Sequence, residues 1–293
     1  MSTSQATVKP DVTGFYDPST FTITYVVADP ESGRCAIIDS VLDYDPKSGR
    51  TSTESADRVA DFIKTEKLSV EWILDTHVHA DHLTAAPYMK EQFGGKIGIG
   101  AHVPIVQKTF KKIFNVDGHL PDDGSQFDHL FKEGDTLMIG GIKGTVMETP
   151  GHTPACISYL VGDAIFVGDT LFMHDYGTAR CDFPGGDART LYKSIKRIYE
   201  LPDETRMFLC HDYQPDGRDP IWETTVGEQK ARNIHLNAQT TEDEFVEMRT
   251  ERDKGLDMPV LILPAVQVNM RAGHMPEPED NGTRYLKIPL NVF

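Results

Sequence analysis

Metal-binding residue types are concentrated in one short stretch of the sequence. "THVHADH", residues 76–82, directly follows the apolar, β-forming run "VEWIL". Asp169 and His211 each end a short apolar run, and His152 lies in a Pro- and Gly-bounded turn after a strand. Imidazole and carboxylate groups suit zinc, Fe(II) or manganese. Functional sites are normally assembled from loops at strand ends. The pattern therefore predicts a metal site made by His77, His79, His82, His152, Asp169 and His211.

The same residue types also occur as ordinary hydrogen-bonding groups at strand ends. That explanation suffices for one such residue taken alone, for example His211, but not for the complete set. The remaining histidines have no comparable context, and we expect them on the surface or in the core: His102, His119, His129, His174, His235 and His274.

The elements that must position these residues follow a repeated order. Residues 21–29 and 33–40 predict a β-hairpin, and apolar spacing in 55–68 predicts a helix. The helical pattern "HLTAAPYMKEQFG", residues 82–94, predicts a further helix that follows the "THVHADH" stretch. Short strands with Gly-rich turns recur between 135 and 170, and a helix over 187–201 follows them. The sequence thus predicts an α/β (α+β) protein of two similar halves. Each half is a sheet covered by helices on one face, and the sheets pack against each other.

Beyond about residue 220 the sequence becomes more helical. "TTEDEFVEMRTERDKG" contains Thr241 followed three residues later by Glu244, which is the pattern of a helix capping box. No Pro/Gly/Ser-rich linker divides the chain, so we expect one domain over residues 1–293.

Charge and composition narrow the classes of partner. The net charge is −16, from 29 basic and 45 acidic residues, and such a field repels nucleic acids and anionic membranes. The first residues lack the pattern of a secretory signal. The longest apolar stretch, "MPVLILPAVQV", is too short to span a bilayer, and four scattered cysteines fit a reducing compartment. We expect a cytoplasmic protein with neither a nucleic-acid nor a membrane partner.

The motifs together resemble a known fold. "THVHADH", "GHTP", "GDT", "HDY" and the early "IIDS" are similar to the metallo-β-lactamase fold, a four-layer αβ/βα sandwich. The resemblance implies a core over about residues 15–235 and a C-terminal helical extension over about 236–293.

Two kinds of chemistry are found on this fold. The sequence resembles the glyoxalase II thioesterases in having every ligand position for two zinc ions. That resemblance implies that one ion is bound by His77, His79 and His152, and the other by Asp81, His82 and His211. Asp169 would bridge the two ions, which together would generate a hydroxide nucleophile.

The segments "ARCDFPGGDARTLY" and "VQVNMRAG" resemble the persulfide dioxygenase branch more specifically. This resemblance implies a single Fe(II) on His77, His152 and Asp169, which form the two-histidine, one-carboxylate triad of oxygenases. The implied reaction oxidises glutathione persulfide with O2 and water to sulfite and glutathione. His79 would orient the ligands, and the residues implied to assist catalysis are Asp81, His82, His211 and Tyr213.

The resemblance also implies a substrate site. Arg180 and Arg271 would hold glutathione carboxylates, Asp182 would orient Arg180, and Tyr213 would donate a hydrogen bond. Tyr176 and Cys181 would line the pocket, although we expect both Cys156 and Cys181 to act as packing residues. Family members are often dimers, so we expect a homodimer. A non-enzymatic sensor of persulfide or metal remains a further alternative.

Three segments depart from that family. "HDYGTARCDF", after "GDTLFM", is longer and more polar than in the family, and residues 43–56 and the residues after 255 are also long. These departures bear on the identity of the substrate more than on the metal.

Overall fold

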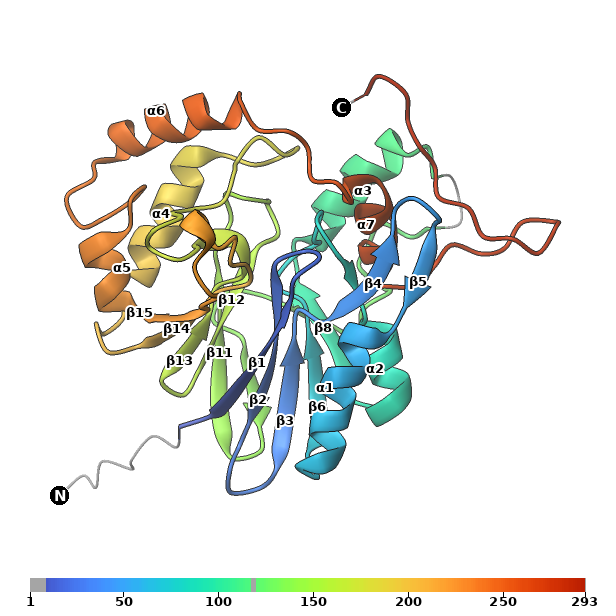
Figure 1. Ribbon diagram of the computed structural model, residues 1–293, viewed down its shortest axis with the longest axis horizontal. Helices are drawn as coiled ribbons and strands as arrows, with labels where there is room; N and C mark the ends of the chain where they lie inside the picture. The colour runs from blue at the N-terminus through green and yellow to red at the C-terminus, as the bar shows by residue number, and fades with distance from the viewer. Residues whose placement is uncertain (1–8, 117–119, 293) are drawn as a thin grey trace.

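Two six-stranded sheets form the centre of the protein in the computed structural model, which describes residues 9–116 and 120–292. The first sheet has the order β1 (Asp11–Asp17), β2 (Thr22–Ala28), β3 (Arg34–Ile38), β6 (Ser69–Leu74), β8 (Lys96–Gly100), β9 (His129–Phe131). The second has the order β10 (Thr136–Ile139), β11 (Ile142–Glu148), β12 (Ile157–Val161), β13 (Ala164–Phe166), β14 (Arg206–Phe208), β15 (Glu223–Thr225). Figure 1 shows the two sheets side by side in the middle of the molecule.

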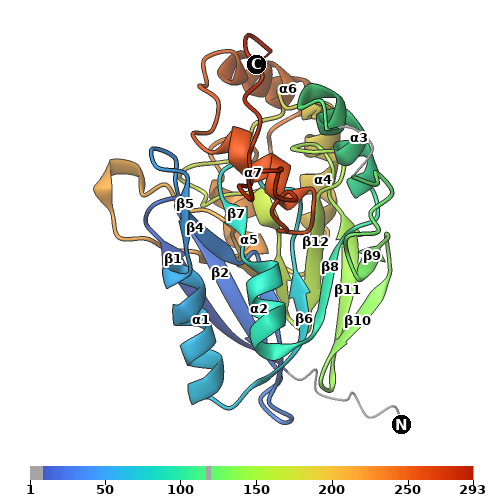
Figure 2. The same cartoon turned by 90° about the vertical axis from the view of Figure 1, so that its right-hand side faces the viewer.

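Helices cover the outer face of each sheet. α1 (Glu54–Thr65), α2 (Ala86–Phe93) and α3 (Val103–Ile113) belong to the first half, and α4 (Ala188–Ile198), α5 (Val226–Arg232) and α6 (Glu242–Asp253) to the second. In Figure 2, α1 and α2 lie in front of the first sheet. A small third sheet joins β5 (Arg50–Ser52), β4 (Val41–Asp45) and β7 (Leu83–Thr84), and α7 (Ile262–Asn269) packs on β7.

Alternation of side chains along the strands creates three apolar layers. In β2, Ile23, Tyr25 and Val27 pack with residues of the second sheet, whereas Val26 packs with the helices of the first half. Successive side chains of a strand point to opposite faces, so a strand buried on both sides reads as a continuous apolar run. Each fully buried aliphatic side chain contributes roughly 1.5–3 kcal/mol. The predicted four-layer αβ/βα sandwich is therefore confirmed.

Most of the predicted elements are present, with shifts at their ends. The hairpin β2–β3 pairs antiparallel, and Asp187 caps α4 by accepting a hydrogen bond from the Thr190 backbone N–H. Thr241 and Glu244 form the predicted capping box of α6. The helix expected after His82 begins later, at Ala86, because Leu83 and Thr84 pair with β4.

The region beyond residue 220 is not purely helical, because β15 adds a last strand to the second sheet. None of the helices in the described residues has both the length and the apolar character that a membrane span requires. His119 and the first eight residues lie outside the described part of the chain.

Candidate metal centre and its cavity

The metal-binding residue types come together at one end of the two sheets. The "THVHADH" loop follows β6, His152 follows β11, Asp169 follows β13, and His211 follows β14. The loop after β14 also pairs with the start of β2, where the Ile23 N–H donates to the Cys210 carbonyl at 2.7 Å. This contact joins the sheets directly at the site. Strand ends from both halves therefore supply the residues, as the sequence predicted.

His77, His152 and Asp169 form the first cluster. One Asp169 oxygen, Oδ2, lies 3.8 Å from His77 Nε2 and 3.6 Å from His152 Nε2. All three side chains are buried. Ligand atoms bound at about 2.0–2.2 Å around one ion lie roughly 3.0–3.6 Å apart. The three atoms therefore stand at nearly the spacing that one shared metal ion requires.

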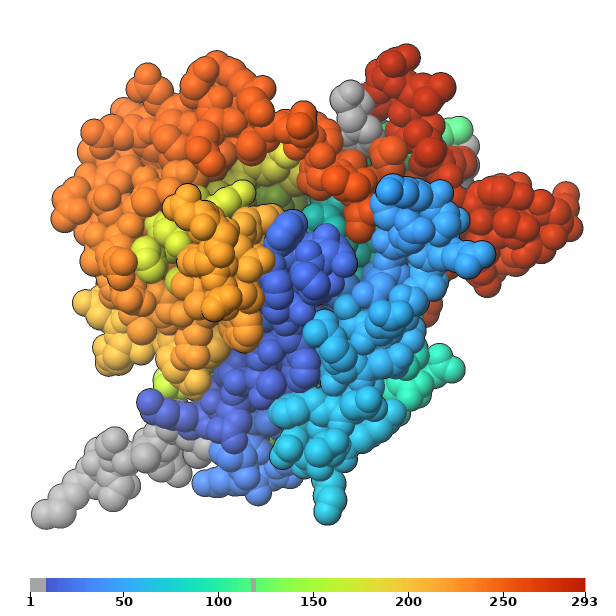
Figure 3. Space-filling view, in the orientation of Figure 1, coloured from blue at the N-terminus to red at the C-terminus, as the bar shows by residue number. Residues whose placement is uncertain are grey.

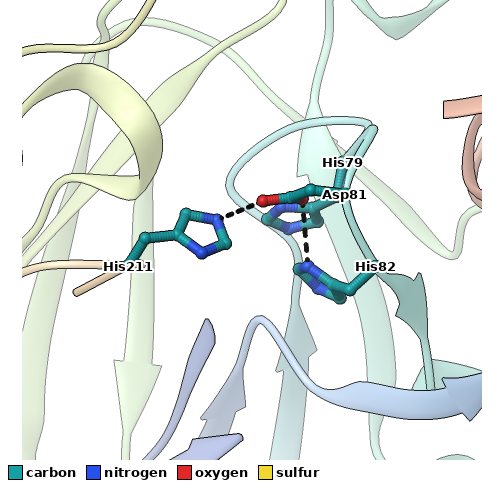
Figure 4. Close-up of side chains that lie close together, drawn as sticks. All are labelled: His79, Asp81, His82 and His211. Atoms are coloured by element: carbon teal, nitrogen blue, oxygen red, sulfur yellow. Dashed lines mark ion pairs between the residues drawn. The ribbon is translucent and has the colours of Figure 1, made fainter. Parts of the chain in front are cut away.

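His79, Asp81, His82 and His211 form a second cluster, with one ligand atom of each within 4.8 Å of the others. Figure 4 shows the Asp81 carboxylate between His211 and His82. Asp81 Oδ2 lies 2.8 Å from His211 Nε2, and Asp81 Oδ1 lies 3.3 Å from His82 Nδ1. His211 Nε2 also lies 3.2 Å from Asp169 Oδ1, which connects the two clusters. The Asp81–His211 pair is closer than two ligands of one ion usually stand.

Unpaired polar atoms indicate that these residues fit a metal. Buried polar atoms in proteins almost always have hydrogen-bond partners. Among the described residues, the buried side-chain polar atoms that lack one include His77 Nε2, His79 Nδ1 and His82 Nε2. Asp81 Oδ1, Asp169 Oδ1 and His211 Nε2 have close contacts only with other residues of the two clusters. The donor set and its unpaired atoms fit one or two transition-metal ions.

The nitrogens that face away from the centre are held by the protein. His79 Nε2 is 2.9 Å from Asp39 Oδ1, and His152 Nδ1 is 2.8 Å from the Arg180 carbonyl. A carbonyl can only accept, so His152 Nδ1 carries the proton and Nε2 is free to bind a metal. Such outer hydrogen bonds orient metal-binding imidazoles.

Asn269 holds the metal-binding loop from behind. Its amide nitrogen donates to the His79 carbonyl at 2.9 Å and to the His82 carbonyl at 2.7 Å. Its oxygen accepts from the Thr84 N–H. Sequence reasoning noted "NMRAG" but not this role of Asn269, and it treated Asp39 only as part of a strand motif. No local signal in "IIDS" or "NMRAG" shows which side chain faces the loop.

Burial and neighbouring charges set the protonation states. Burial lowers the pKa of His77 and of His82, so both imidazoles are neutral and able to bind metal. Burial also disfavours charge on His79, but the Asp39 carboxylate outweighs it and raises the pKa of His79 to about 9. For Asp169, burial favours the neutral acid, but the nearby His211 and His77 outweigh it and hold the pKa well below its usual range.

Tyr213 lies beside the second cluster within a group of aromatic rings. Its ring stacks on Tyr176 at 4.6 Å between centroids and on His211 at 5.7 Å. Phe172 and Phe21 contact the same ring. Burial raises the pKa of the Tyr213 phenol, so its hydroxyl remains protonated.

A cavity of about 950 Å³ opens onto the metal centre. In Figure 3 this face is hollowed between the β1–β2 turn, the β4–β5 hairpin and the segment before α7. His152, Asp169 and Asp81 line the cavity, as do Tyr176 and Tyr213. The long segments at 43–56 and after 255 both contribute to its wall.

Only some of the residues predicted to bind the substrate line this cavity. Arg180 lines it, but its guanidinium donates to both oxygens of Asp182 at 2.6 Å and to the Asp257 carbonyl at 2.6 Å. Asp182 thus orients Arg180, as expected. Neither Asp182 nor Arg271 is among the described residues lining the cavity, and Arg271 Nε is buried without a hydrogen bond. Their roles toward substrate stay predictions.

Burial confirms the expected packing role of Cys181, but the expectation that it lines the pocket was wrong, because it is not among the described residues that line the cavity. His235 is buried, which is one of the two settings expected for it, and it also lines the cavity. Its Nδ1 accepts from the Thr178 N–H.

Three arginines that sequence reasoning did not single out also line the cavity, and one of them, Arg249, is paired with Asp253. The other two are Arg50 and Arg252. Arg50 comes from β5 and Arg252 from the last turn of α6. Within the described residues, neither has an ion-pair partner in the structure. Only the tertiary structure brings these distant segments to one cavity.

Comparison with known proteins supports the assignment of the family. The model of the metallo-beta-lactamase superfamily matches residues 20–211. The chain is 58% identical to a "probable metallo-hydrolase" of Burkholderia pseudomallei, covering 96% of this chain and 99% of that one. It is 51% identical to "glyoxylase B2" of Dictyostelium discoideum, covering 92% of each.

More distant similarities point to persulfide dioxygenases. The chain is 30% identical to the human mitochondrial persulfide dioxygenase ETHE1, covering 88% of this chain and 87% of that one. The crystal structure of ETHE1 from Myxococcus xanthus superposes with a TM-score of 0.72 at 31% identity, covering 90% of this chain and all of that one. By sequence, fold and metal-binding motifs, the chain belongs to the metallo-beta-lactamase superfamily.

Proposed function

We propose that the protein is an iron-dependent persulfide dioxygenase. The observation that carries this proposal is the arrangement of His77, His152 and Asp169, with one carboxylate oxygen 3.6–3.8 Å from two imidazole nitrogens. Two imidazoles and one carboxylate on one side of an ion are typical of mononuclear Fe(II) oxygenases. The likeness to the two ETHE1 proteins supports the same conclusion.

The reaction balances as glutathione persulfide plus O2 plus water, giving glutathione, sulfite and two protons. The outer sulfur is oxidised and O2 is reduced. Fe(II) held by His77, His152 and Asp169 would supply the redox chemistry with O2. The protein's own groups bind and orient the substrate and exclude bulk water.

Tyr213 has a defined part in this proposal. Its hydroxyl stays protonated and its ring lines the cavity beside His211. A protonated phenol can donate a hydrogen bond to the anionic sulfur of a persulfide. The aromatic rings around it exclude water from that end of the cavity.

We also propose that Arg50 and Arg252 bind the carboxylates of glutathione. A chain of net charge −16 needs local cations to hold such a substrate. Arg180 already gives most of its N–H groups to Asp182 and to backbone carbonyls. Arg50 and Arg252 have no such commitment among the described residues, and guanidinium suits bidentate capture of carboxylates.

A dinuclear zinc hydrolase of a glutathione thioester is the second candidate. Two observations favour it: the complete second cluster, and the hydrolase-type names of the more similar relatives. Two zinc ions would activate water for attack on a thioester. The Asp81–His211 contact of 2.8 Å argues against this candidate, because it is shorter than the usual distance between two ligands of one ion.

One set of measurements separates these candidates. The protein, purified without added metal, is analysed for iron and zinc, and then given glutathione persulfide in an oxygen electrode with assay of sulfite. About one iron per chain with O2 uptake and sulfite release is expected. Two zinc ions, or cleavage of S-lactoylglutathione without O2 uptake, would refute the proposal. Metal or persulfide binding without any turnover would instead indicate a sensor.

A further inference from the structure

One peptide group links α6 of the C-terminal extension to His152. The carbonyl of the Arg180–Cys181 peptide accepts from His152 Nδ1 at 2.8 Å. The N–H of the same peptide, on Cys181, donates to Asp253 Oδ2 at 2.8 Å. Asp253 is the last residue of α6, outside the part of the chain that matches the family model.

Asp253 is held rigidly in the interior. Its Oδ1 accepts from Arg249 Nε at 2.8 Å and lies 2.6 Å from Arg249 Nη2. Both side chains are almost completely buried, and Arg249 Nη1 also donates to the Thr178 carbonyl at 3.1 Å. The carboxylate is therefore fixed in place one hydrogen bond away from the peptide that His152 contacts.

A carboxylate that accepts a hydrogen bond from the N–H of a peptide group affects how strongly the carbonyl oxygen of the same group accepts a hydrogen bond. Hydrogen bonds in a chain polarise one another, so a charged acceptor at the N–H makes the carbonyl a stronger acceptor. A stronger acceptor opposite His152 Nδ1 keeps the proton on that nitrogen. The Nε2 lone pair is then free to bind metal, and the ring is held in one orientation.

We propose that Asp253 is a positioning residue for metal binding, which acts on His152 through the Arg180–Cys181 peptide. The proposal requires only that His152 binds a metal. It holds whether the ion is iron or zinc and whether the reaction is oxidation or hydrolysis. Loss of the proposed dioxygenase function would therefore leave it unaffected.

The first test needs no substitution at Asp253. Nitrogen-15 NMR of the metal-free protein reports which ring nitrogen carries the proton, and the His152 signals are identified by their loss in His152→Ala. The expected state is His152 protonated at Nδ1 and not at Nε2. A wild-type His152 protonated mainly at Nε2 overturns the proposal.

The second test is Asp253→Asn, with Glu251→Gln as the matched control. Glu251 lies on the same helix, is exposed, and among the described residues forms an ion pair only with Lys254. Asp253→Asn should increase the Nε2-protonated fraction of His152 and weaken Zn²⁺ and Co²⁺ binding by about tenfold, at the lower end of the effect of such outer partners. Glu251→Gln should change neither. An unchanged tautomer and metal affinity in Asp253→Asn contradict the proposal.

A paired substitution separates this role from folding. Asp253→Asn alone leaves the buried Arg249 charge without a partner, which is destabilising. The double variant Arg249→Gln/Asp253→Asn removes both charges at similar volume. It should melt closer to the wild type than Asp253→Asn and still show the tautomer change. A folded double variant with wild-type His152 signals would show that Asp253 is only structural.

Discussion

Gly151 directly precedes the metal-binding His152, and its replacement by alanine tests how the "GHTP" turn is built. The backbone of Gly151 has φ +139°, a conformation that L residues rarely adopt. A Cβ at this position would lie 2.4 Å from the backbone N and Cα of Leu191, in the first turn of α4. Neither neighbour is the end of a flexible side chain, so the turn and the helix must move apart.

The expected loss of stability in Gly151→Ala is the sum of backbone strain and steric overlap. Backbone strain of this kind costs about 1–3 kcal/mol, and forcing an extra carbon into a packed contact costs about 1–3 kcal/mol. The free energy of unfolding should therefore fall by roughly 2–6 kcal/mol. At about 2 °C per kcal/mol for a chain of this size, the Tm should fall by roughly 4–12 °C.

The assay compares thermal unfolding and metal content of Gly151→Ala with those of Gly134→Ala. Gly134 also has a positive φ, of +76°, but a Cβ there would meet nothing within 4 Å. The control should lose only the strain, about 1 kcal/mol, and should keep its metal. Gly151→Ala should lose both stability and metal, because His152 moves with the turn. Equal Tm values for the two variants would refute the steric argument.

Three further predictions follow from the same structure. His152→Ala should abolish iron binding while His82→Ala retains it, as measured by metal analysis with His102→Ala as the control. Loss of iron in the His82 variant would count against a mononuclear site. Arg249→Met leaves the Asp253 charge buried and unpaired, so chemical denaturation should show a loss of about 3–5 kcal/mol. The exposed pair of Arg232 with Glu228 provides the control. Arg232→Met should lower the free energy of unfolding by less than about 1 kcal/mol. Similar losses in the two variants would contradict the burial argument. All four thiols are buried with pKa raised by burial, to about 12 for Cys35 and Cys156. Iodoacetamide at pH 8 should therefore label them only after unfolding, and rapid native labelling detected by mass spectrometry would disprove this.

Local sequence was sufficient to predict much of the architecture. The hairpin of β2 and β3 and the helix expected over 187–201, which is α4, depend on neighbours a few residues apart, and the structure confirms both. The start of α2 was placed too early, because the pairing of Leu83–Thr84 with β4 is a contact between distant segments. Helical periodicity carries no information about such a contact.

The sequence by itself singled out the candidate metal-binding side chains, because residue types at strand ends remain visible in a linear motif. Only the tertiary structure decided which of them share an ion-sized space. It placed His77, His152 and Asp169 about 3.6–3.8 Å apart and brought Asp81 to 2.8 Å from His211. It also decided the partners that hold these residues, such as Asn269 on the loop and Asp253 behind His152. Those contacts join residues from about 70 to 190 positions apart. Chain folding alone, through the packing of α6 on α4 and of α7 on β7, determines that they meet.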